Sequence, residues 1–266
     1  MNRVICVIMA MALFLFNVSG AQIVTKSNTD DQIKNELLDL MKKAERGEPE
    51  SQYQLGLSYL VRGDGVEAHK WFRKAAEQEY APAQNHLGLQ FANGLDMERD
   101  CNEASKWMRK AAHQDYVLAQ DNLGVWYMDG ICVERDYKEA ITWFRKAAEK
   151  GLCSAQLHLG MIYEEGGNGI DQNYMESAKW YNKAAIQGDW IAQSSLGKMY
   201  AYGRGVDQND IEAYKWVLIE EMPSGIEVSP DLKRLLLDRM TKEQIFLAQQ
   251  KAKEFAESKE KNNTGQ

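Results

Sequence analysis

The sequence predicts an all-α protein, a right-handed α/α superhelical solenoid of five helix-turn-helix repeats with N- and C-terminal capping helices. Two observations lead to this prediction. The pair Leu-Gly recurs at positions 55/56, 87/88, 123/124, 159/160 and 196/197. A tryptophan follows each pair, and successive tryptophans lie 36, 36, 37 and 36 residues apart, at Trp71, Trp107, Trp143, Trp180 and Trp216. Such a period is typical of stacked units that bury their apolar faces against one another, so we expect one continuous elongated domain.

The composition argues against a nucleic-acid partner. Of the 266 residues, 32 are Lys or Arg and 39 are Asp or Glu, which leaves a formal net charge of −7. No basic run is longer than Lys42-Lys43. Because nucleic-acid binding needs a cluster of positive charge, we expect the partner to belong to another class.

The N-terminus resembles an export signal. Residues 1–21 combine an early Arg3, an apolar stretch from Val4 to Phe16 and a small-residue end at Gly20 and Ala21. This pattern predicts a signal peptide cleaved near Gly20 or Ala21. An uncleaved anchor is the alternative, although the apolar stretch is short for a bilayer span. We expect a periplasmic or secreted protein that is not an integral membrane protein after signal cleavage, with a flexible N-terminus at residues 22–30.

An amphipathic helix precedes the first repeat. Residues 31–47 carry apolar side chains at helical spacing, at Ile33, Leu37, Leu40, Met41 and Ala44. A terminal repeat has one face without a neighbour, so this segment predicts an N-terminal capping helix.

Residues 48–221 form the five predicted repeats. The first helix of each repeat follows the pattern Ala-Gln-x-x-Leu-Gly-x-x-Tyr, as at Ala119, Leu123 and Tyr127. These three side chains share one helical face and predict the core, while the glycine beside Leu lets a neighbouring backbone approach closely. In the second helix, small residues flank the tryptophan by one turn, as Ala140 and Ala147 flank Trp143, so the tryptophans are expected to be core residues.

Carboxylates recur at the start of the second helices. An acid or amide stands seven residues before each tryptophan and a Glu four before it: Asp64/Glu67, Asp100/Glu103, Asp136/Glu139, Asn173/Glu176 and Asn209/Glu212. This spacing predicts a capping box, in which the two side chains satisfy backbone N–H groups at the helix start. The carboxylates are therefore interpreted as structural and not as catalytic pairs.

Glycines mark the loop between the helices of a repeat. Gly94, Gly130, Gly166 and Gly203 are expected to end the first helices in the left-handed conformation. None of these loops follows a strand or continues into Gly-Lys-Ser/Thr, so a phosphate loop is not predicted.

The C-terminal part departs from the repeat. Residues 222–257 are expected to form C-terminal capping helices, because the segment Thr241 to Ala256 starts with a Thr-x-x-Gln box and carries an apolar stripe. The polar residues 258–266 predict a disordered tail.

Three cysteines remain after the predicted cleavage. Cys101 and Cys132 both fall near the turns between the helices of adjacent repeats, so a disulfide between them is one arrangement that an oxidising compartment would allow. Cys153 takes the small-residue position that Ala81 has in the second repeat, and a packed thiol is expected there. The four histidines show no metal-ligand spacing, so no metal site is predicted.

The repeat resembles the Sel-1-like repeat family, a relative of the tetratricopeptide repeats. The resemblance rests on residues 155–163 (AQLHLGMIY), 202–206 (YGRGV) and 143–151 (WFRKAAEKG), and covers about residues 40 to 256. It implies a scaffold or adaptor for protein complexes, with repeated residues that are largely structural. Such proteins act in bacterial envelopes, in host interaction or in secretory quality control.

By analogy with tetratricopeptide arrays, the first helices should line a concave wall that binds a protein or peptide. The candidate partner-binding residues lie one before, three after and six after the repeat Leu: His86, Gln90, Asn93, Asn122, Trp126, Asp129, His158, Ile162, Glu165, Met199 and Tyr202. Ser195 completes the set of the fifth repeat. Trp126 is the expected anchor, since aromatic side chains dominate interface energetics. The alternative is that Trp126, Ile162 and Met199 pack against the next repeat.

The predicted function is therefore a non-enzymatic protein–protein interaction scaffold, monomeric and without a catalytic residue, cofactor or metal. A secreted virulence or host-interaction factor is one alternative. An exported hydrolase acting on cell-wall material is another, although no Gly-x-Ser-x-Gly nucleophile motif occurs.

Overall fold

The protein is described by a computed structural model that covers residues 27–94, 98–221 and 229–264. The predicted signal peptide at residues 1–21 lies outside these ranges. Within them the chain folds into successive helices whose pairs follow the predicted repeats. The prediction of an all-α solenoid built from five helical hairpins is confirmed.

The chain divides into two compact units where one continuous domain was expected. Unit 1 ends at Arg135 and unit 2 begins at Asp136, so the division falls between the two helices of the third repeat. A repeat contacts mainly its immediate neighbours, and the network of contacts along such an array therefore divides easily. The two units are described separately below.

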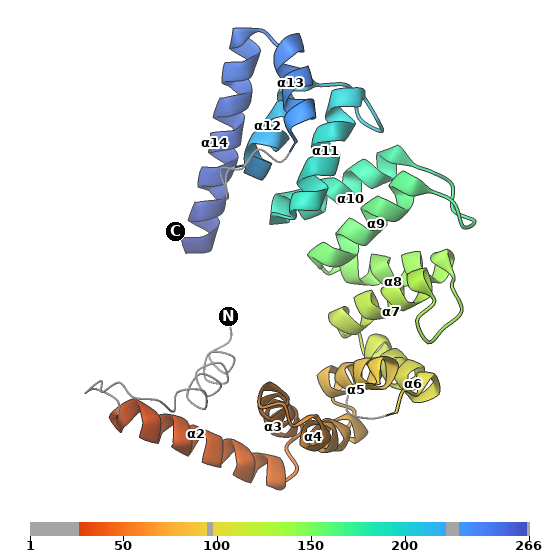
Figure 1. Cartoon of the computed structure of the whole chain (residues 1–266), viewed down its shortest axis with the longest axis vertical. Helices are drawn as coiled ribbons and strands as arrows, with labels where there is room; N and C mark the ends of the chain where they lie inside the picture. The colour runs from red at the N-terminus through yellow and green to blue at the C-terminus, as the bar shows by residue number, and fades with distance from the viewer. Residues whose placement is uncertain (1–26, 95–97, 222–228, 265–266) are drawn as a thin grey trace. The chain divides into compact units, whose positions relative to one another are not determined.

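Unit 1 holds the first half of the array. Each of its helices packs against the next one along the chain, as the red to yellow-green part of Figure 1 shows. Helix α2 begins within the segment predicted to be flexible at residues 22–30. The helices are α2 (Ser27–Glu45), α3 (Pro49–Val61), α4 (Gly65–Glu77), α5 (Ala81–Asn93), α6 (Cys101–His113) and α7 (Val117–Asp129).

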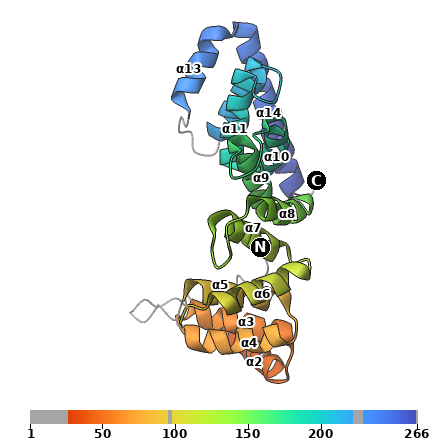
Figure 2. The ribbon, with the colours of Figure 1, turned by 90° about the vertical axis from the view of Figure 1, so that its right-hand side faces the viewer.

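Unit 2 holds the second half and the C-terminal helices. Helices α8 to α12 again pack in chain order, as the labelled α8 to α11 show in Figure 2, and the long α14 lies against α12 (Figure 1). The helices are α8 (Tyr137–Glu149), α9 (Cys153–Glu165), α10 (Tyr174–Gln187), α11 (Trp190–Tyr202), α12 (Asp210–Glu221), α13 (Pro230–Arg239) and α14 (Lys242–Thr264).

The C-terminal end differs from its prediction. Helix α14 continues to Thr264, whereas residues 258–266 were expected to be disordered. On the solvent side of α14, Lys253 and Glu257 form an ion pair one turn apart, with 3.8 Å between their charged atoms. On the other side of α14, Ala248 and Ala252 are fully buried, as a capping helix requires.

The repeated apolar residues form the core as predicted. The repeat Leu side chains are buried in all five units, as are four of the five tryptophans. Trp71 in the first repeat is half-buried. A lysine three residues after the tryptophan lies over the ring in the first four repeats, with centroid distances of 3.9, 5.0, 4.2 and 4.0 Å at Lys74, Lys110, Lys146 and Lys183. These aliphatic stems and charges cover the outer side of each ring.

Only one of the two hydrogen bonds of each predicted capping box forms. In each repeat the N-cap side chain accepts a hydrogen bond from the Glu N–H three residues later, for example at 3.1 Å between Asp100 and Glu103. The N-cap N–H, however, already donates to a carbonyl of the preceding helix, from Asp100 to Phe91 at 3.0 Å and from Asn209 to Tyr200 at 2.9 Å. The Glu side chain is thereby left to pair with a lysine, as Glu103 does with Lys106 at 2.7 Å.

The loop glycines have the predicted positive φ angles. Gly94, Gly130 and Gly203 end their helices in the left-handed conformation. Gly166 has φ 64° and ψ −158°, because the chain turns there into a short bridge between Gly167 and Ile170. A side chain is strained in all four positions.

Candidate partner-binding site

The large apolar residues of the predicted binding face are buried. Trp126 and Ile162 are each 3% exposed and Met199 is 1% exposed. The prediction of Trp126 as an exposed anchor is therefore wrong, and Gln90 is buried as well. The reason is geometric: at 3.6 residues per turn, a residue three after Leu lies about 60° from it around the helix, beside the core face.

The other predicted residues lie farther from Leu around the helix, and their exposure increases with that angle. Residues one before Leu are half-buried, namely His86, Asn122 and His158. Residues six after Leu are exposed, namely Asn93, Asp129, Glu165 and Tyr202. His86, Asn93, Asn122 and Asp129 belong to unit 1, and His158, Glu165 and Tyr202 belong to unit 2. Their role in binding stays a prediction.

The two histidines contribute to packing between repeats. The His86 ring stacks on Phe72 of the preceding repeat at a centroid distance of 5.0 Å, and its Nδ1 lies 3.3 Å from the Tyr53 hydroxyl. Burial lowers the pKa of His86. His158 contacts Phe144 at 4.7 Å in the same manner. These two histidines, each one residue before a repeat Leu, therefore share a packing position.

A second structural role went unrecognised in the sequence. The Gln three residues before each repeat Leu is buried and its Nε2 donates to a carbonyl eight residues earlier: Gln52 to Ala44, Gln84 to Ala76, Gln120 to Ala112, Gln156 to Ala148 and Gln193 to Ala185. The five-fold recurrence of the Gln was the available signal. These amides satisfy carbonyls at the end of the preceding helix.

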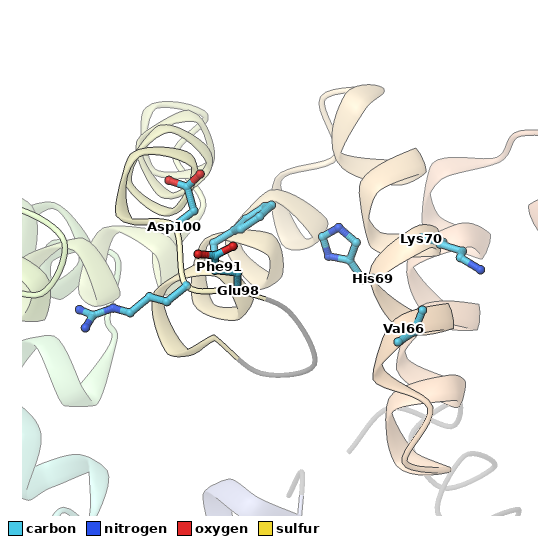
Figure 3. Close-up of a pocket in the computed structure, with 7 residues that line it drawn as sticks. Val66, His69, Lys70, Phe91, Glu98 and Asp100 are labelled. Atoms are coloured by element: carbon cyan, nitrogen blue, oxygen red, sulfur yellow. The ribbon is translucent and has the colours of Figure 1, made fainter.

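A cleft lies between α4 and the link from α5 to α6, within unit 1. Its volume is about 570 Å³, and it is lined by Val66, His69, Lys70, Phe91, Glu98, Arg99 and Asp100. Figure 3 shows the His69 ring between α4 and Phe91, while Lys70 points away from Phe91. The His69 and Phe91 rings meet edge to face at a centroid distance of 5.5 Å. This geometry provides an aromatic wall that is open on one side.

Hydrogen bonds fix the orientation of the His69 ring, which lines the cleft. Its Nδ1 lies 3.2 Å from the Oε1 of Gln90, and Arg73 Nε donates to its Nε2 at 3.4 Å. Burial lowers the pKa of His69, and the Arg73 charge acts in the same direction against the hydrogen bond to Gln90. The ring is therefore neutral at neutral pH. Gln90, predicted to touch the partner, instead orients a residue that lines the cleft.

The charged residues around the cleft balance in sign. Lys70 and Arg99 are basic and Glu98 and Asp100 are acidic. Lys70 pairs with Glu67, and the Asp100 carboxylate is the N-cap of α6. The apolar surface of Val66, which is 55% exposed, and the Phe91 ring are what the cleft offers to a ligand. This combination suits an apolar side chain better than a strongly charged group.

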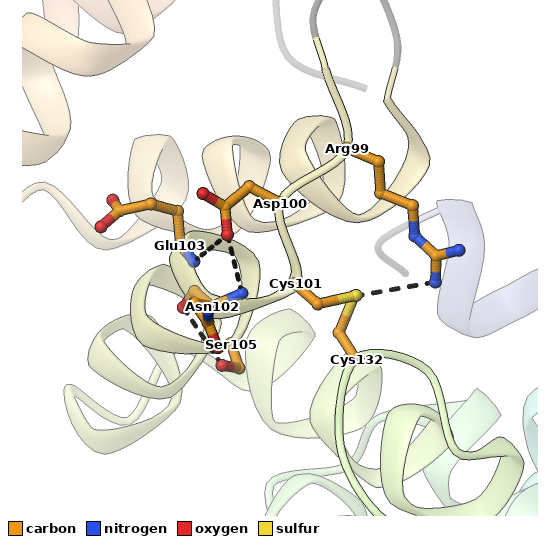
Figure 4. Close-up of a disulfide and its surroundings, with 7 residues drawn as sticks. All are labelled: Arg99, Asp100, Cys101, Asn102, Glu103, Ser105 and Cys132. Atoms are coloured by element: carbon orange, nitrogen blue, oxygen red, sulfur yellow. Dashed lines mark hydrogen bonds between the residues drawn. A yellow bond between two sulfur atoms is a disulfide. The ribbon is translucent and has the colours of Figure 1, made fainter.

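A disulfide adjoins the cleft. Cys101 follows the lining residue Asp100 directly and is joined to Cys132, with 4.6 Å between the two Cα atoms. Arg99 Nη2 lies 4.0 Å from the Cys132 Sγ, as Figure 4 shows. The pair that the sequence allowed is thus joined. Cys153, in unit 2, is a free thiol that donates to the Ala184 carbonyl at 3.7 Å, and burial raises its pKa.

Other chemistry finds little support in the described part of the chain. No group of three or more His, Cys, Asp or Glu residues lies close enough together there to hold a metal ion. Among the described helices, none combines the length and the apolar character needed to cross a membrane.

Comparison with protein families gives five matches to the Sel1 repeat, over residues 49–80, 81–116, 117–152, 153–189 and 190–218. The chain belongs to the Sel1 repeat family. Sel1 repeat proteins are generally protein-interaction scaffolds, and no catalytic family is indicated for this chain. No curated protein matches it.

Two solved structures are similar to this Sel1 repeat protein. A protective antigen present in uropathogenic Escherichia coli strains, with an SLR fold, is 30% identical with a TM-score of 0.70, over 82% of this chain and 47% of that chain. The chain therefore spans about half of that antigen. A Sel1 repeat protein from Oxalobacter formigenes is 31% identical with a TM-score of 0.65, over 80% of this chain and 95% of that one.

Proposed function

We propose that this Sel1 repeat protein is an exported scaffold that holds a segment of a partner protein in the cleft of unit 1 and performs no chemistry itself. The observation that carries the proposal is the family match over five consecutive repeats, since Sel1 repeats generally mediate protein interactions. The host-interaction and hydrolase alternatives gain no support from the comparisons.

The cleft is the proposed contact because it joins an exposed apolar group to a fixed wall. Val66 is exposed, whereas Phe91 and His69 are held by packing and hydrogen bonds. A partner segment that presents an apolar side chain would bury it between Val66 and Phe91 without ordering these walls first. The balanced charges around the cleft disfavour strongly charged segments.

The proposal of export is supported by one feature of the sequence and one of the structure. The first is the N-terminal pattern of residues 1–21. The second is the Cys101–Cys132 disulfide, because such bonds persist in oxidising compartments. The proposed location is therefore the periplasm or the extracellular medium.

The test is affinity capture with tagged protein, residues 22–266, from an extract of the cells that make it. The wild type is compared with Val66→Arg, which places charge at the cleft, and with Leu118→Arg, a matched change at a residue that is 47% exposed in unit 1 and does not line the cleft. We expect the wild type and Leu118→Arg to retain one partner that Val66→Arg loses. A partner retained equally by all three proteins would refute the cleft as the binding site.

A further inference from the structure

We infer that the Cys101–Cys132 disulfide holds one wall of the cleft in its binding shape, so that partner binding depends on the oxidation of this pair. The inference rests on the proposed function, because it concerns the regulation of the same cleft. It is carried by the position of the bond, by the backbone of Cys132 and by the contacts of Arg99.

The disulfide is continuous with the cleft wall. Glu98, Arg99 and Asp100 line the cleft in sequence, and Cys101 is the next residue. The bond from Cys101 crosses from the second repeat to Cys132 in the third. It thereby ties this wall to the loop that follows α7.

The disulfide also holds Cys132 in a backbone conformation that few side chains adopt. Cys132 has φ 55°, in the left-handed region that favours glycine. The corresponding position of the fifth repeat, two residues after the glycine that ends the first helix, holds Gly205 with φ 70°. The fourth repeat holds Asn168 at this position with φ 53°, so the conformation belongs to the repeat loop. Asparagine and glycine adopt it readily, whereas at Cys132 the bond to Cys101 helps to hold it.

Arg99 depends on the same bond. Its guanidinium reaches the Cys132 sulfur at 4.0 Å, across the disulfide (Figure 4). Asp100, by contrast, is also held by its N–H bond to the Phe91 carbonyl and by its capping bonds to α6. Loss of the disulfide should therefore release Arg99 and the loop of Cys132 while the start of α6 stays in place.

The redox step needs only a dithiol. Two electrons and two protons from the dithiol break the S–S bond and give the thiols of Cys101 and Cys132, while the dithiol becomes a disulfide. A freed wall must be ordered again when the partner binds, and this entropy cost weakens affinity. Cys153 lies in unit 2 and takes no part in the bond.

The experiment uses linear peptides selected from a phage-displayed random library on the oxidised protein and retained only if Val66→Arg abolishes their binding. Their affinity is measured for the oxidised wild type, for the wild type reduced with dithiothreitol and for the double variant Cys101→Ser/Cys132→Ser. Cys153→Ser is the control that keeps the bond. Circular dichroism checks that each protein is folded, and hydrogen exchange follows residues 98–104 and 130–134.

We expect both the reduced wild type and the double variant to bind about tenfold or more weakly, with faster exchange in the two segments, and Cys153→Ser to behave as the wild type. Equal affinity of the oxidised and reduced forms would overturn the inference and leave the proposed function intact. If no selected peptide depends on Val66, the proposed function fails and the inference fails with it.

Discussion

At the scale of single residues, the repeat glycine is fixed by what packs against it. A Cβ added at Gly160 would lie 2.5 Å from the ring of Tyr181, whose hydroxyl donates to Glu164 at 2.7 Å. At Gly197, in the same position of the next repeat, the nearest atom would be 3.5 Å away. The sequence predicted that a neighbouring backbone approaches this glycine. At Gly160 the close neighbour is an aromatic ring instead, so the prediction is wrong there.

These two glycines provide a matched test. Gly160→Ala should lower the free energy of unfolding by about 1–3 kcal/mol, since the buried ring must shift. Gly197→Ala should be neutral or should stabilise by up to about 1 kcal/mol, because alanine is the better helix former. Urea unfolding of both variants measures the difference. Equal effects of the two substitutions would contradict the packing described for Gly160.

Glu220 should make stability depend on pH. Its carboxyl is buried and accepts a hydrogen bond from Ser229 at 3.4 Å, and burial raises its pKa. A raised pKa in the folded state means that the neutral form is favoured there. The protein therefore loses stability as the pH rises from the unfolded pKa, about 4.3, through the raised folded value.

The variant Glu220→Gln isolates this effect. Because Gln stays neutral, the variant should become more stable relative to the wild type over that same rise in pH, as measured by chemical unfolding at several pH values. If the difference in unfolding free energy between the wild type and Glu220→Gln stayed constant with pH, ionisation of the buried Glu220 carboxyl would not destabilise the fold. Glu254→Gln, on the exposed side of α14, is the control.

At the scale of elements, the buried glutamines join each helix to the one before it. Gln84 donates to the Ala76 carbonyl at 3.1 Å and accepts from Gln114 Nε2 at 2.7 Å. Gln187 and Gln156 repeat the second contact in unit 2, at 2.8 Å. Each glutamine thus gives a second hydrogen bond to a carbonyl that already accepts a backbone N–H at the end of its helix, as Ala76 does from Glu79 at 3.1 Å.

Replacing such a glutamine tests this role. Gln84→Leu keeps the approximate size but removes the hydrogen bonds of a buried amide to Ala76, Glu79 and Gln114, so we expect a loss of about 1–3 kcal/mol of unfolding free energy. Gln249→Leu, at an exposed position of α14, should change it little. Thermal or urea unfolding measures both, and equal stability of the two variants would contradict the account.

The sequence predicts elements better than it predicts surfaces. Helix pairs, N-caps and the core follow from local periodicity, which repeats five times. The burial of Trp126 follows from helix geometry as well, since its position lies beside the Ala119 and Leu123 face. The cleft could not be predicted in this way, because packing brings Val66 of α4 to the link at Glu98.

At the scale of the whole molecule, the cleft lies between the first and second repeats and the disulfide joins the second repeat to the third, in a chain that we propose is exported. Export predicts that the purified native protein begins near Gln22 and contains one thiol, that of Cys153. Intact mass with and without alkylation measures both. A native chain that retains residues 1–21, or that reacts at Cys101 and Cys132, would contradict the proposed export.

The most direct test of the central claim is photocrosslinking in the cells that make the protein. A photoreactive amino acid replaces Val66 in the cleft or Leu118 outside it, and crosslinked products are identified by mass spectrometry. The account predicts one protein joined to position 66 and absent from position 118, with the crosslink lost after reduction of the disulfide. A partner that crosslinks from position 118 and not from position 66 would contradict the claim that the cleft is the binding site.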